Sequence, residues 1–344
     1  MGDQYVGADV HQATTTFTVR DAQGKVTCRS VVRTEEEALL SFVRSLPGRV
    51  HLTFEESCYA EWLYELLVDE VAQLVVCNAR RHVRQREEKG DQIDADELSE
   101  RLRGGFLKGV YHRSHGTKDL RRLVVTYRAL VRDSVRVGHR TQALLRGRGL
   151  SGVQELATVE RKAGATMARC LTWFGEEHEC LQQLRAETKR VLERESRRHP
   201  ACRLLESVPG IGWVRAAFVV SQVRTPHRFR TKRQLWKYSG LAVVVHSSSD
   251  HRIVDGEIVR QQWRATRGLN REANKLLKET FKAAAVSACQ KGHSMHGYWR
   301  VRVAAGMRPE MAHLTAARKI AATCLALWKK GERFELSRVD QPTS

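Results

Sequence analysis

The sequence predicts an α/β domain at the N-terminus, followed by a long and mainly α-helical region. Strand-like and helix-like segments alternate as far as about residue 112, which is the order of an α/β fold. Beyond this point, a seven-residue repeat of apolar positions indicates a long paired helix, and a glycine-containing turn then joins two further helices. With 344 residues, the chain has room for two or three domains. We expect their ranges to be 1–112, 113–199 and 200–344.

The first domain opens with three segments rich in Val and Thr, which predict three strands joined by short turns. A threonine followed by three glutamates predicts a capping box and a helix over 34–46. The expected strands are Gln4–Val10, Thr14–Arg20, Lys25–Val32, Val50–Phe54 and Gln73–Cys77, and the other expected helices are Glu61–Glu70, Ala79–Glu88 and Ile93–Leu102. This order matches a ribonuclease-H-like arrangement.

A long helix is expected over Thr117–Arg148, because core positions recur there every three or four residues. The repeat predicts a coiled-coil seam that pairs with a later helical run, Glu176–Arg198. Its members are Leu123, Tyr127, Leu130, Ser134, Val137, Thr141 and Leu144. The second domain is therefore expected to be a helical coiled-coil arm.

Four arginines spaced four residues apart lie on one face of that helix: Arg128, Arg132, Arg136 and Arg140. Like charges at this spacing destabilise a helix unless a counter-ion lies nearby. This arginine stripe is either a face that follows the phosphates of a nucleic acid or an ordinary solvated face, and the pattern alone favours neither.

The third domain is expected to be mainly helical. The segment Leu204–Val220 reads as two helices joined by a Pro-Gly-Ile-Gly sequence at 209–212, the pattern of a helix-hairpin-helix turn. Gly210 and Gly212 would let backbone N–H groups approach a phosphate, although any tight turn between helices can use such glycines. Two longer helices are expected at Arg271–Gln290 and Pro309–Lys330.

The charge of the chain indicates the class of partner. The sequence has 59 Lys and Arg against 39 Asp and Glu, a net charge of +20, which indicates binding to a polyanion and above all to nucleic acid. No apolar run is long enough to cross a membrane, and neither a signal-peptide pattern nor a membrane-binding amphipathic segment stands out. We expect a soluble, cytoplasmic protein without a membrane partner. The 8 cysteines form no C-x-x-C pair, which argues against a zinc site.

Four acidic residues stand at positions suited to a metal site. Asp9 ends the first predicted strand and Glu55 ends the fourth, while Asp91 and Asp94 lie three residues apart at the start of a helix. Converging carboxylates are the ligands that Mg²⁺ prefers, and their mutual repulsion requires a cation. Two such ions can clamp the oxygens of a phosphodiester. Taken singly, each acid is better explained as a cap, a turn former or a solvated group, and Glu56 competes with Glu55 for the strand end.

A serine-rich segment, 246–250, follows the apolar run Leu241–Val245. A polar loop after a buried segment is ordinary, and a serine hydroxyl becomes a nucleophile only with help from a base, a cation or a metal. Histidines and arginines lie nearby in the sequence, among them Arg267, but proximity in the sequence does not establish a site. From composition alone, a structural loop is the better interpretation.

Seven short blocks of the sequence, taken in the order in which they occur, form a specific combination. They are Tyr5–His11 around Asp9, Phe54–Ser57 around Glu55, Lys89–Ala95 around Asp91 and Asp94, Pro209–Gly212, Tyr238–Leu241, Arg267–Asn270 and Ala317–Lys319. Together these blocks resemble the DEDD-type insertion-sequence recombinases, the insertion-sequence one-hundred-and-ten family, which also includes Piv-like DNA invertases. The resemblance extends over essentially the whole chain.

The resemblance implies a RuvC-like nuclease domain, a coiled-coil arm and a C-terminal transposase domain with a nucleophilic serine. It implies that the four acids bind Mg²⁺ and act in catalysis, that dimers assemble into a tetramer, and that a non-coding bridge RNA pairs with donor and target DNA. Alignment from Gly240 and Leu241 places the nucleophile at Ser248, with Ser247 as the closest alternative. Ser249 stands where the family usually has Gly.

Two other interpretations stay open. One is a RuvC-like, Mg²⁺-dependent nuclease that cleaves structured DNA without a covalent intermediate, and the other is a nucleic-acid-binding protein without enzymatic activity. A recombinase has to conserve the energy of the phosphodiester between cutting and rejoining, and the sequence contains no ATP-binding P-loop motif that could restore it. A phosphoserine ester would conserve that energy, which favours the recombinase.

Overall fold

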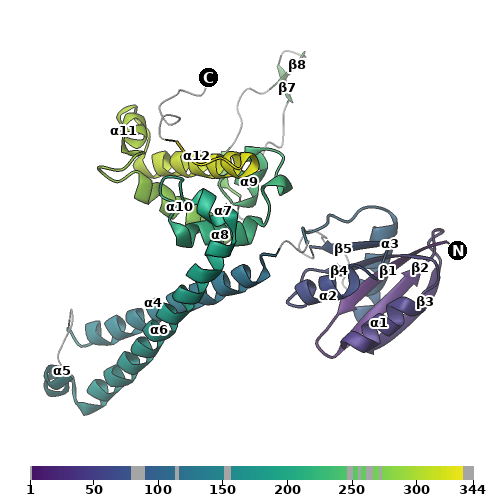
Figure 1. Ribbon diagram of the computed structural model, residues 1–344, viewed down its shortest axis with the longest axis horizontal. Coiled ribbons are helices and arrows are strands. Elements are labelled where there is room, and N and C mark those ends of the chain that lie inside the picture. Colours follow the sequence, from purple (N-terminus) through teal and green to yellow (C-terminus); the bar gives the residue numbers. More distant parts are fainter. Residues whose placement is uncertain are drawn as a thin grey trace. The chain divides into compact units, whose positions relative to one another are not determined.

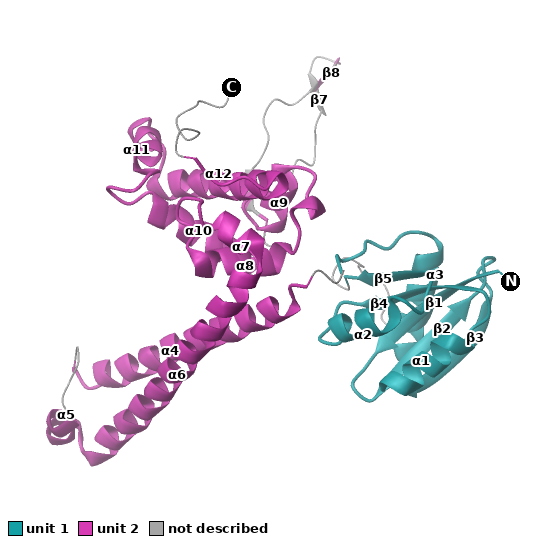
Figure 2. Ribbon diagram, in the orientation of Figure 1, with its two compact units in different colours: residues 1–114 teal, residues 115–344 magenta. Residues whose placement is uncertain are grey.

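The computed structural model describes residues 2–78, 90–112, 116–150, 156–245, 251–254, 257–260, 266–270 and 273–335. The chain forms two compact units, residues 1–114 (unit 1) and 115–344 (unit 2) (Figure 2). Within the described residues, no helix combines the length and the apolarity needed to span a bilayer. The helical arm and the C-terminal region belong to the same compact unit, and their separation into domains at 113–199 and 200–344 stays a prediction.

Unit 1 is built around a five-stranded mixed sheet (Figure 1). Its elements are β1 (Asp3–Val10), β2 (Thr14–Arg20), β3 (Val26–Arg33), α1 (Glu36–Ser45), β4 (Arg49–Glu55), α2 (Ala60–Leu67), β5 (Gln73–Cys77) and α3 (Asp91–Arg103). The strand order is β3-β2-β1-β4-β5, with the first three strands antiparallel and β4 and β5 parallel to β1. This mixed α/β fold is consistent with the predicted ribonuclease-H-like arrangement. The predicted helix at Ala79–Glu88 lies outside the described residues.

The helices cover both faces of this sheet. Alternate residues of a strand point to opposite faces, so Val6 and Ala8 pack with the buried side chains of α1 and α2. Gly7 and Asp9 face the other way, towards α3, which contacts β1, β2 and β4. A Cβ atom on Gly7 would lie 2.2 Å from the carbonyl oxygen of Ala95, so the absence of a side chain lets α3 rest on the backbone of β1.

The predicted capping box at the start of α1 is wrong. The helix begins at Glu36, and its N-cap residue Glu35 makes no capping hydrogen bond through its side chain. The Thr34 hydroxyl instead donates to the carbonyl oxygen of His11 at 2.9 Å and lies 2.9 Å from the hydroxyl of Thr15. Thr34 therefore ties the end of β3 to the turn between β1 and β2, a long-range contact that the local sequence pattern does not contain.

Unit 2 begins with a helical hairpin, formed by α4 (Lys118–Arg146) and α6 (Ala165–Arg198), with α5 (Leu156–Ala163) between them (Figure 1). The two long helices pack against each other over much of their length. The predicted seam falls on the inner side of α4, where Tyr127, Ser134 and Val137 are buried. Gln182 of α6 donates to the hydroxyl of Ser134 at 3.2 Å, which satisfies the polar member of the seam.

The rest of unit 2 is a helical body with short strands. Its helices are α7 (Pro200–Leu205), α8 (Trp213–Val223), the 3₁₀ turn η2 (Pro226–Arg228), α9 (Lys232–Tyr238), α10 (Lys275–Ala288), α11 (His296–Ala304) and α12 (Pro309–Lys330). β6 (Val243–Val245) pairs with β9 (Thr266–Leu269), and β7 (His251–Val254) pairs with β8 (Glu257–Arg260). One core joins these helices to the base of the hairpin, through Leu120, Val124 and Leu192.

The predicted helix at 271–290 is shorter in the structure, because the Asn274 side chain accepts a hydrogen bond from the Leu277 N–H at 3.0 Å and caps α10. The helix predicted from Leu204 to the Pro-Gly-Ile-Gly turn has the wrong bounds, because α7 covers Pro200–Leu205 and ends before that turn.

Candidate active site

Asp9 lies near the end of the central strand, where three elements meet. β1 and β4 run parallel with Ala8 opposite Phe54, so Asp9 and Glu55 follow next on neighbouring strands and face the same side. That side is covered by α3, whose first turn carries Asp91 and Asp94. Because α3 rests directly on Gly7, its N-terminus is held near the end of β1. The N-terminus of a helix also favours negative charge, through its free N–H groups and its dipole.

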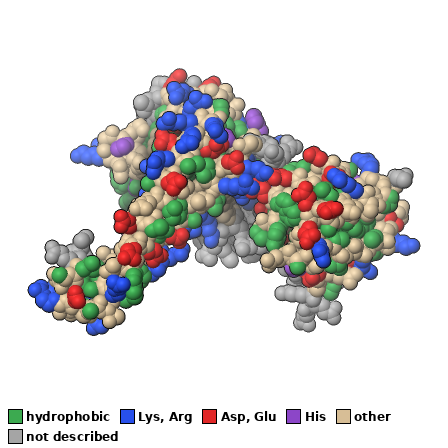
Figure 3. All heavy atoms as spheres, turned by 60° about the horizontal axis from the view of Figure 1, so that its bottom comes forward, with side chains coloured by type: hydrophobic (Ala, Val, Ile, Leu, Met, Phe, Trp, Pro, Cys, Tyr) green, Lys and Arg blue, Asp and Glu red, His purple; other side chains and the backbone are tan. Residues whose placement is uncertain are grey.

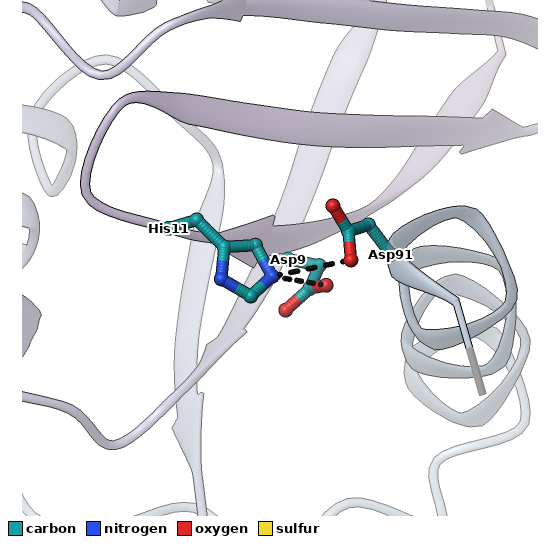
Figure 4. Close-up of side chains that lie close together, drawn as sticks. All are labelled: Asp9, His11 and Asp91. Atoms are coloured by element: carbon teal, nitrogen blue, oxygen red, sulfur yellow. Dashed lines mark hydrogen bonds and ion pairs between the residues drawn. The ribbon is translucent and has the colours of Figure 1, made fainter.

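Asp9, His11 and Asp91 form a compact cluster, here called the acid–histidine triad (Figure 4). The Nε2 atom of His11 lies 3.1 Å from Oδ2 of Asp9 and 3.4 Å from Oδ1 of Asp91. The ligand atoms of all three residues lie within 4.8 Å of one another. The two carboxylates and the imidazole therefore converge from the strand end, the following turn and the helix start.

The electrostatics of the triad suit a cation. Burial raises the pKa of Asp9 above its ordinary value, the charge and hydrogen bond of His11 lower it, and the charges of Asp94 and Asp91 raise it further, leaving a net rise. The charge of Asp9 and its hydrogen bond raise the pKa of His11. A half-buried carboxylate surrounded by other carboxylates is costly in its charged form. A divalent metal would remove this cost, and the carboxylate donors fit such an ion.

The other two predicted acids lie at the edge of the triad. The charge of Asp94 acts on both Asp9 and His11, so Asp94 is close, but among the described residues neither Asp94 nor Glu55 completes the set of converging ligand atoms. Glu56 is engaged elsewhere: its carboxylate lies 2.9 Å from Nε2 of His112. The register of β1 and β4 ends with Ala8 opposite Phe54, so Glu55 is the next residue at the level of Asp9, and its part in the metal site stays a prediction.

His11 is a member of this cluster that the sequence reasoning missed. The available signal was the Asp-x-His spacing at the end of a predicted strand. Because side chains alternate between the two faces, a residue two positions after Asp9 lies on the same face as Asp9. The backbone of His11 is also fixed, because its N–H donates to Thr14 O at 3.0 Å and its carbonyl accepts from Thr34.

The predicted nucleophile Ser248 and its alternative Ser247 lie outside the described residues. The chain that leads to them is held by Arg318 of α12, whose Nε donates to the carbonyl oxygen of Leu241 at 2.7 Å. The Nε1 atom of Trp236 in turn donates to the carbonyl oxygen of Arg318 at 2.9 Å. Burial lowers the pKa of Arg318, and its Nη2 atom has no hydrogen-bond partner within the described part of the chain.

The two predicted phosphate-binding glycines have different surroundings. Gly210 adopts a φ of 75°, and a Cβ atom there would lie 2.2 Å from the carbonyl oxygen of Ala284 in α10. Its lack of a side chain is therefore explained by packing and by backbone conformation. Gly212 is the N-cap residue of α8, and a Cβ atom there would meet nothing within 4 Å. Arg267 belongs to β9, but its side chain is outside the described part of the structure.

The arginine stripe on α4 has counter-ions within unit 2. Arg128 pairs with Glu279 of α10, Arg136 pairs with Asp133 at 3.1 Å, and Arg140 lies 3.4 Å from Glu177 of α6. For Arg132, the described residues offer no acidic partner within 4 Å. Figure 3 accordingly shows blue and red side chains intermingled along the hairpin. These pairs relieve part of the repulsion along the stripe, and its contact with phosphates stays a prediction.

Comparisons with known protein families cover most of the chain. Residues 6–148 match a family model for a DEDD transposase, described as "Transposase". Residues 202–300 match a second model, described as "Transposase IS116/IS110/IS902 family". No curated protein shows significant sequence similarity to the chain. The first match includes every residue of the acid–histidine triad, and the second spans the Pro-Gly-Ile-Gly turn and the serine-rich segment.

Proposed function

The chain belongs to the IS116/IS110/IS902 family of DEDD transposases, which are DNA-cutting and rejoining enzymes, and from this premise we propose that it is an insertion-sequence recombinase that uses Mg²⁺ and a serine nucleophile. The observation that carries the proposal is the convergence of Asp9 and Asp91 at the end of β1, from segments 82 residues apart in the sequence. We further propose Glu55 and Asp94 as the remaining acids of the same site.

The metal site is proposed to serve phosphoryl transfer. When bound, Mg²⁺ would supply a Lewis acid that polarises the scissile phosphate and neutralises its charge. Asp9 and Asp91 would hold the ion, and α3 holds Asp91 in place through its close contact with Gly7. Membership of the family supports a divalent metal here, and the hard carboxylate oxygens favour Mg²⁺.

The serine is proposed to store the energy of the broken bond. Attack by the Ser248 hydroxyl on the phosphodiester forms a phosphoserine ester and breaks the bond from phosphorus to one strand end. The serine gives its proton to solvent or to a nearby base, and the leaving oxygen takes up a proton and departs as a hydroxyl. A hydroxyl of a second strand then attacks this ester, which reseals DNA and regenerates the serine. The Arg318 contact with Leu241 supports this role, because it fixes the backbone seven residues before Ser248.

Nucleic acids are the proposed partners. A net charge of +20 suits a protein that neutralises several strands at once. We propose donor DNA, target DNA and a non-coding bridge RNA, with the RNA providing sequence recognition by base pairing, and a dimer or tetramer as the active assembly. Of the proposed contacts with phosphates, Gly212 and Arg132 have no packing or ion-pair role among the described residues, and the side chain of Arg267 lies outside the described part of the structure.

The test is to map a covalent adduct. The protein is incubated with nucleic-acid substrate and Mg²⁺, denatured, digested and searched by mass spectrometry for a nucleotide-linked peptide. The expected adduct is on Ser248, and it disappears in Ser248→Ala. An adduct on Ser247 would move the nucleophile by one residue. Efficient strand cleavage by Ser248→Ala without any adduct would instead favour a Mg²⁺-dependent nuclease that acts by hydrolysis.

A further inference from the structure

The metal centre has a feature that its four acids do not explain, which is the imidazole of His11. The His11 side chain is 53% exposed, so packing does not account for its orientation. Its Nε2 atom points towards Asp9 and Asp91 together (Figure 4). The ring thus lies within 3.4 Å of both carboxylates, which are the proposed metal ligands.

The separations of the His11 nitrogen from the two carboxylate oxygens match those of ligands around one ion. Ligands at about 2.1 Å from an octahedral ion lie about 3 Å apart when they occupy neighbouring positions. The observed separations from His11 Nε2 are 3.1 Å and 3.4 Å. Without an ion, the Nε2 atom forms a hydrogen bond with Asp9. Because the same nitrogen lies between two carboxylates, it is also placed to share an ion with them.

The position of His11 does not depend on the metal. Its N–H donates to Thr14 O at 3.0 Å, and its carbonyl oxygen accepts from the Thr34 hydroxyl at 2.9 Å. These bonds close the turn between β1 and β2 and tie it to the end of β3. The Cα atom of His11 is thus held by the sheet itself, and the imidazole is preorganised next to the carboxylates.

On the basis of the proposed metal site, we infer that His11 is a metal ligand through Nε2, so that the centre is a mixed nitrogen and oxygen site and not an all-carboxylate one. An imidazole nitrogen adds to the binding of a first-row transition ion, even of Mn²⁺, the weakest binder of that series, whereas Mg²⁺ gains little from nitrogen. The centre accepts Mg²⁺ but holds Mn²⁺ more tightly than the carboxylates alone would. Replacing His11 therefore weakens Mn²⁺ binding much more than Mg²⁺ binding.

The experiment is carried out on the full-length protein with Mn²⁺ as the probe. Dissociation constants are measured by the loss of the free Mn²⁺ signal in electron paramagnetic resonance, and Mg²⁺ is measured by competition. Electron spin echo envelope modulation then reports whether a nitrogen is bonded to the ion. The variants are His11→Ala and Asp9→Asn, with His139→Ala as the matched control, because His139 is an exposed histidine on α4 in unit 2.

The expected result is nitrogen modulation in the wild type and in His139→Ala, and its loss in His11→Ala. Mn²⁺ affinity falls by about 10–100-fold in His11→Ala, and Mg²⁺ affinity changes by less than about threefold. If Mn²⁺ binds in an Asp9-dependent way without nitrogen modulation, or if His11→Ala binds it as tightly as the wild type, the inference about His11 is overturned while the metal site stands. If Asp9→Asn does not weaken Mn²⁺ binding, the proposed metal site itself is wrong.

Discussion

The two faces of the N-terminal sheet are covered in different ways. On one face, Val6, Ala8, Leu52 and Phe54 meet the apolar sides of α1 and α2, and all four are at most 2% exposed. On the other face, α3 lies against Gly7 and carries acids in its first turn. The first face buries apolar surface, which stabilises the fold. The second face gives up part of that surface to bring carboxylates together.

The comparison teaches that stability and chemistry are separated across one layer of β-strands. Both faces carry a paired arginine and carboxylate at the rim: Arg44 with Glu70 beside α1, and Arg29 with Asp96 between β3 and α3. The difference lies at the end of the central strand, where residue 8 is a buried alanine and residue 9 a half-buried aspartate. Variants on the two faces should therefore have different combinations of effects on activity and stability.

The largest effect is expected from Asp9→Asn, on activity. Removing one carboxylate from a shared metal site should lower Mg²⁺-dependent strand cleavage by at least about 10²-fold. Binding of nucleic acid should persist, because the basic surfaces are unchanged. Strand cleavage on a supercoiled or oligonucleotide substrate, together with a binding titration, measures both properties.

The same variant should raise the stability of the metal-free protein. The pKa of Asp9 is raised in the folded state, so its contribution to stability is complete below the unfolded value of 3.8 and is lost as the pH rises through the folded pKa. At pH 8 in EDTA, we expect Asp9→Asn to raise the Tm by about 2–4 °C. A lower Tm than the wild type would show that the hydrogen bond and ion pair of Asp9 with His11 outweigh the cost of burying its charge without a metal.

Phe54→Ala should have the opposite combination of effects. Phe54 is fully buried under α1 and α2, and its truncation should lower the free energy of unfolding by about 3–5 kcal/mol. Below its new Tm, the folded protein should bind Mn²⁺ with the wild-type affinity, because Phe54 faces away from the triad. Chemical denaturation and Mn²⁺ titration on the same sample separate the two quantities. Loss of metal binding by the folded variant would contradict the separation of the two faces.

Gly7→Ala should affect both properties. The new Cβ atom would lie 2.2 Å from Ala95 O and 2.5 Å from Ser99 N, so α3 has to move. We expect a loss of about 1–3 kcal/mol in stability and, because α3 carries Asp91, a marked loss of Mn²⁺ affinity. Gly138→Ala is the matched control: a Cβ there meets nothing within 4 Å, and the change should stabilise α4 by about 1 kcal/mol.

The smallest effect is expected from Asp96→Asn. Burial acts to raise the pKa of Asp96, but the hydrogen bonds and the charge of Arg29 outweigh it, and the pKa lies below its ordinary value of 3.8. Its contribution is therefore present above pH 3.8 and lost as the pH falls through the lower folded pKa. The variant should lose about 0.5–1 kcal/mol at pH 7 and show a flatter decline below pH 4 in denaturation series. If the variant and the wild type lose stability in the same way below pH 4, the ion pair of Arg29 and Asp96 does not hold α3.

Much of unit 1 could be predicted because its signals are local. The strands show either alternating apolar and polar residues or a continuous apolar run. The acids stand at strand ends and at a helix start, where the topology brings side chains together. The three-dimensional contacts were less accessible. Thr34 looks like a helix cap within its own segment, yet its hydroxyl bonds to His11, which is 23 residues earlier. The place of His11 beside Asp91 likewise depends on α3 resting on β1.

The parts of unit 2 that sequence reasoning missed carry little periodic signal. β6 to β9 are three or four residues long, which is too short for an alternating pattern. α11 has no fully buried residue, so no apolar stripe marks it as a helix. The long helices were visible because each repeats its core positions over many turns. For the arginine stripe, the sequence showed the like charges, but not that Glu279 and Glu177 come from distant helices to meet them.

The base of the hairpin formed by α4 and α6 packs into the core of unit 2, and this has a mechanical consequence. The 29 residues of α4 correspond to a rod of about 44 Å, comparable to about 13 base pairs of B-form duplex. Leu120, Val124 and Tyr127 clamp the first turns of this rod into the helical body, while a separate small cluster of Leu145, Leu150 and Val159 closes the far end. A rotation of about 5° at the clamped end would displace the other end by about 4 Å. The hairpin thus has the geometry of a lever whose short end packs against α8, and a small rotation there corresponds to a movement on the scale of one base-pair step at the far end.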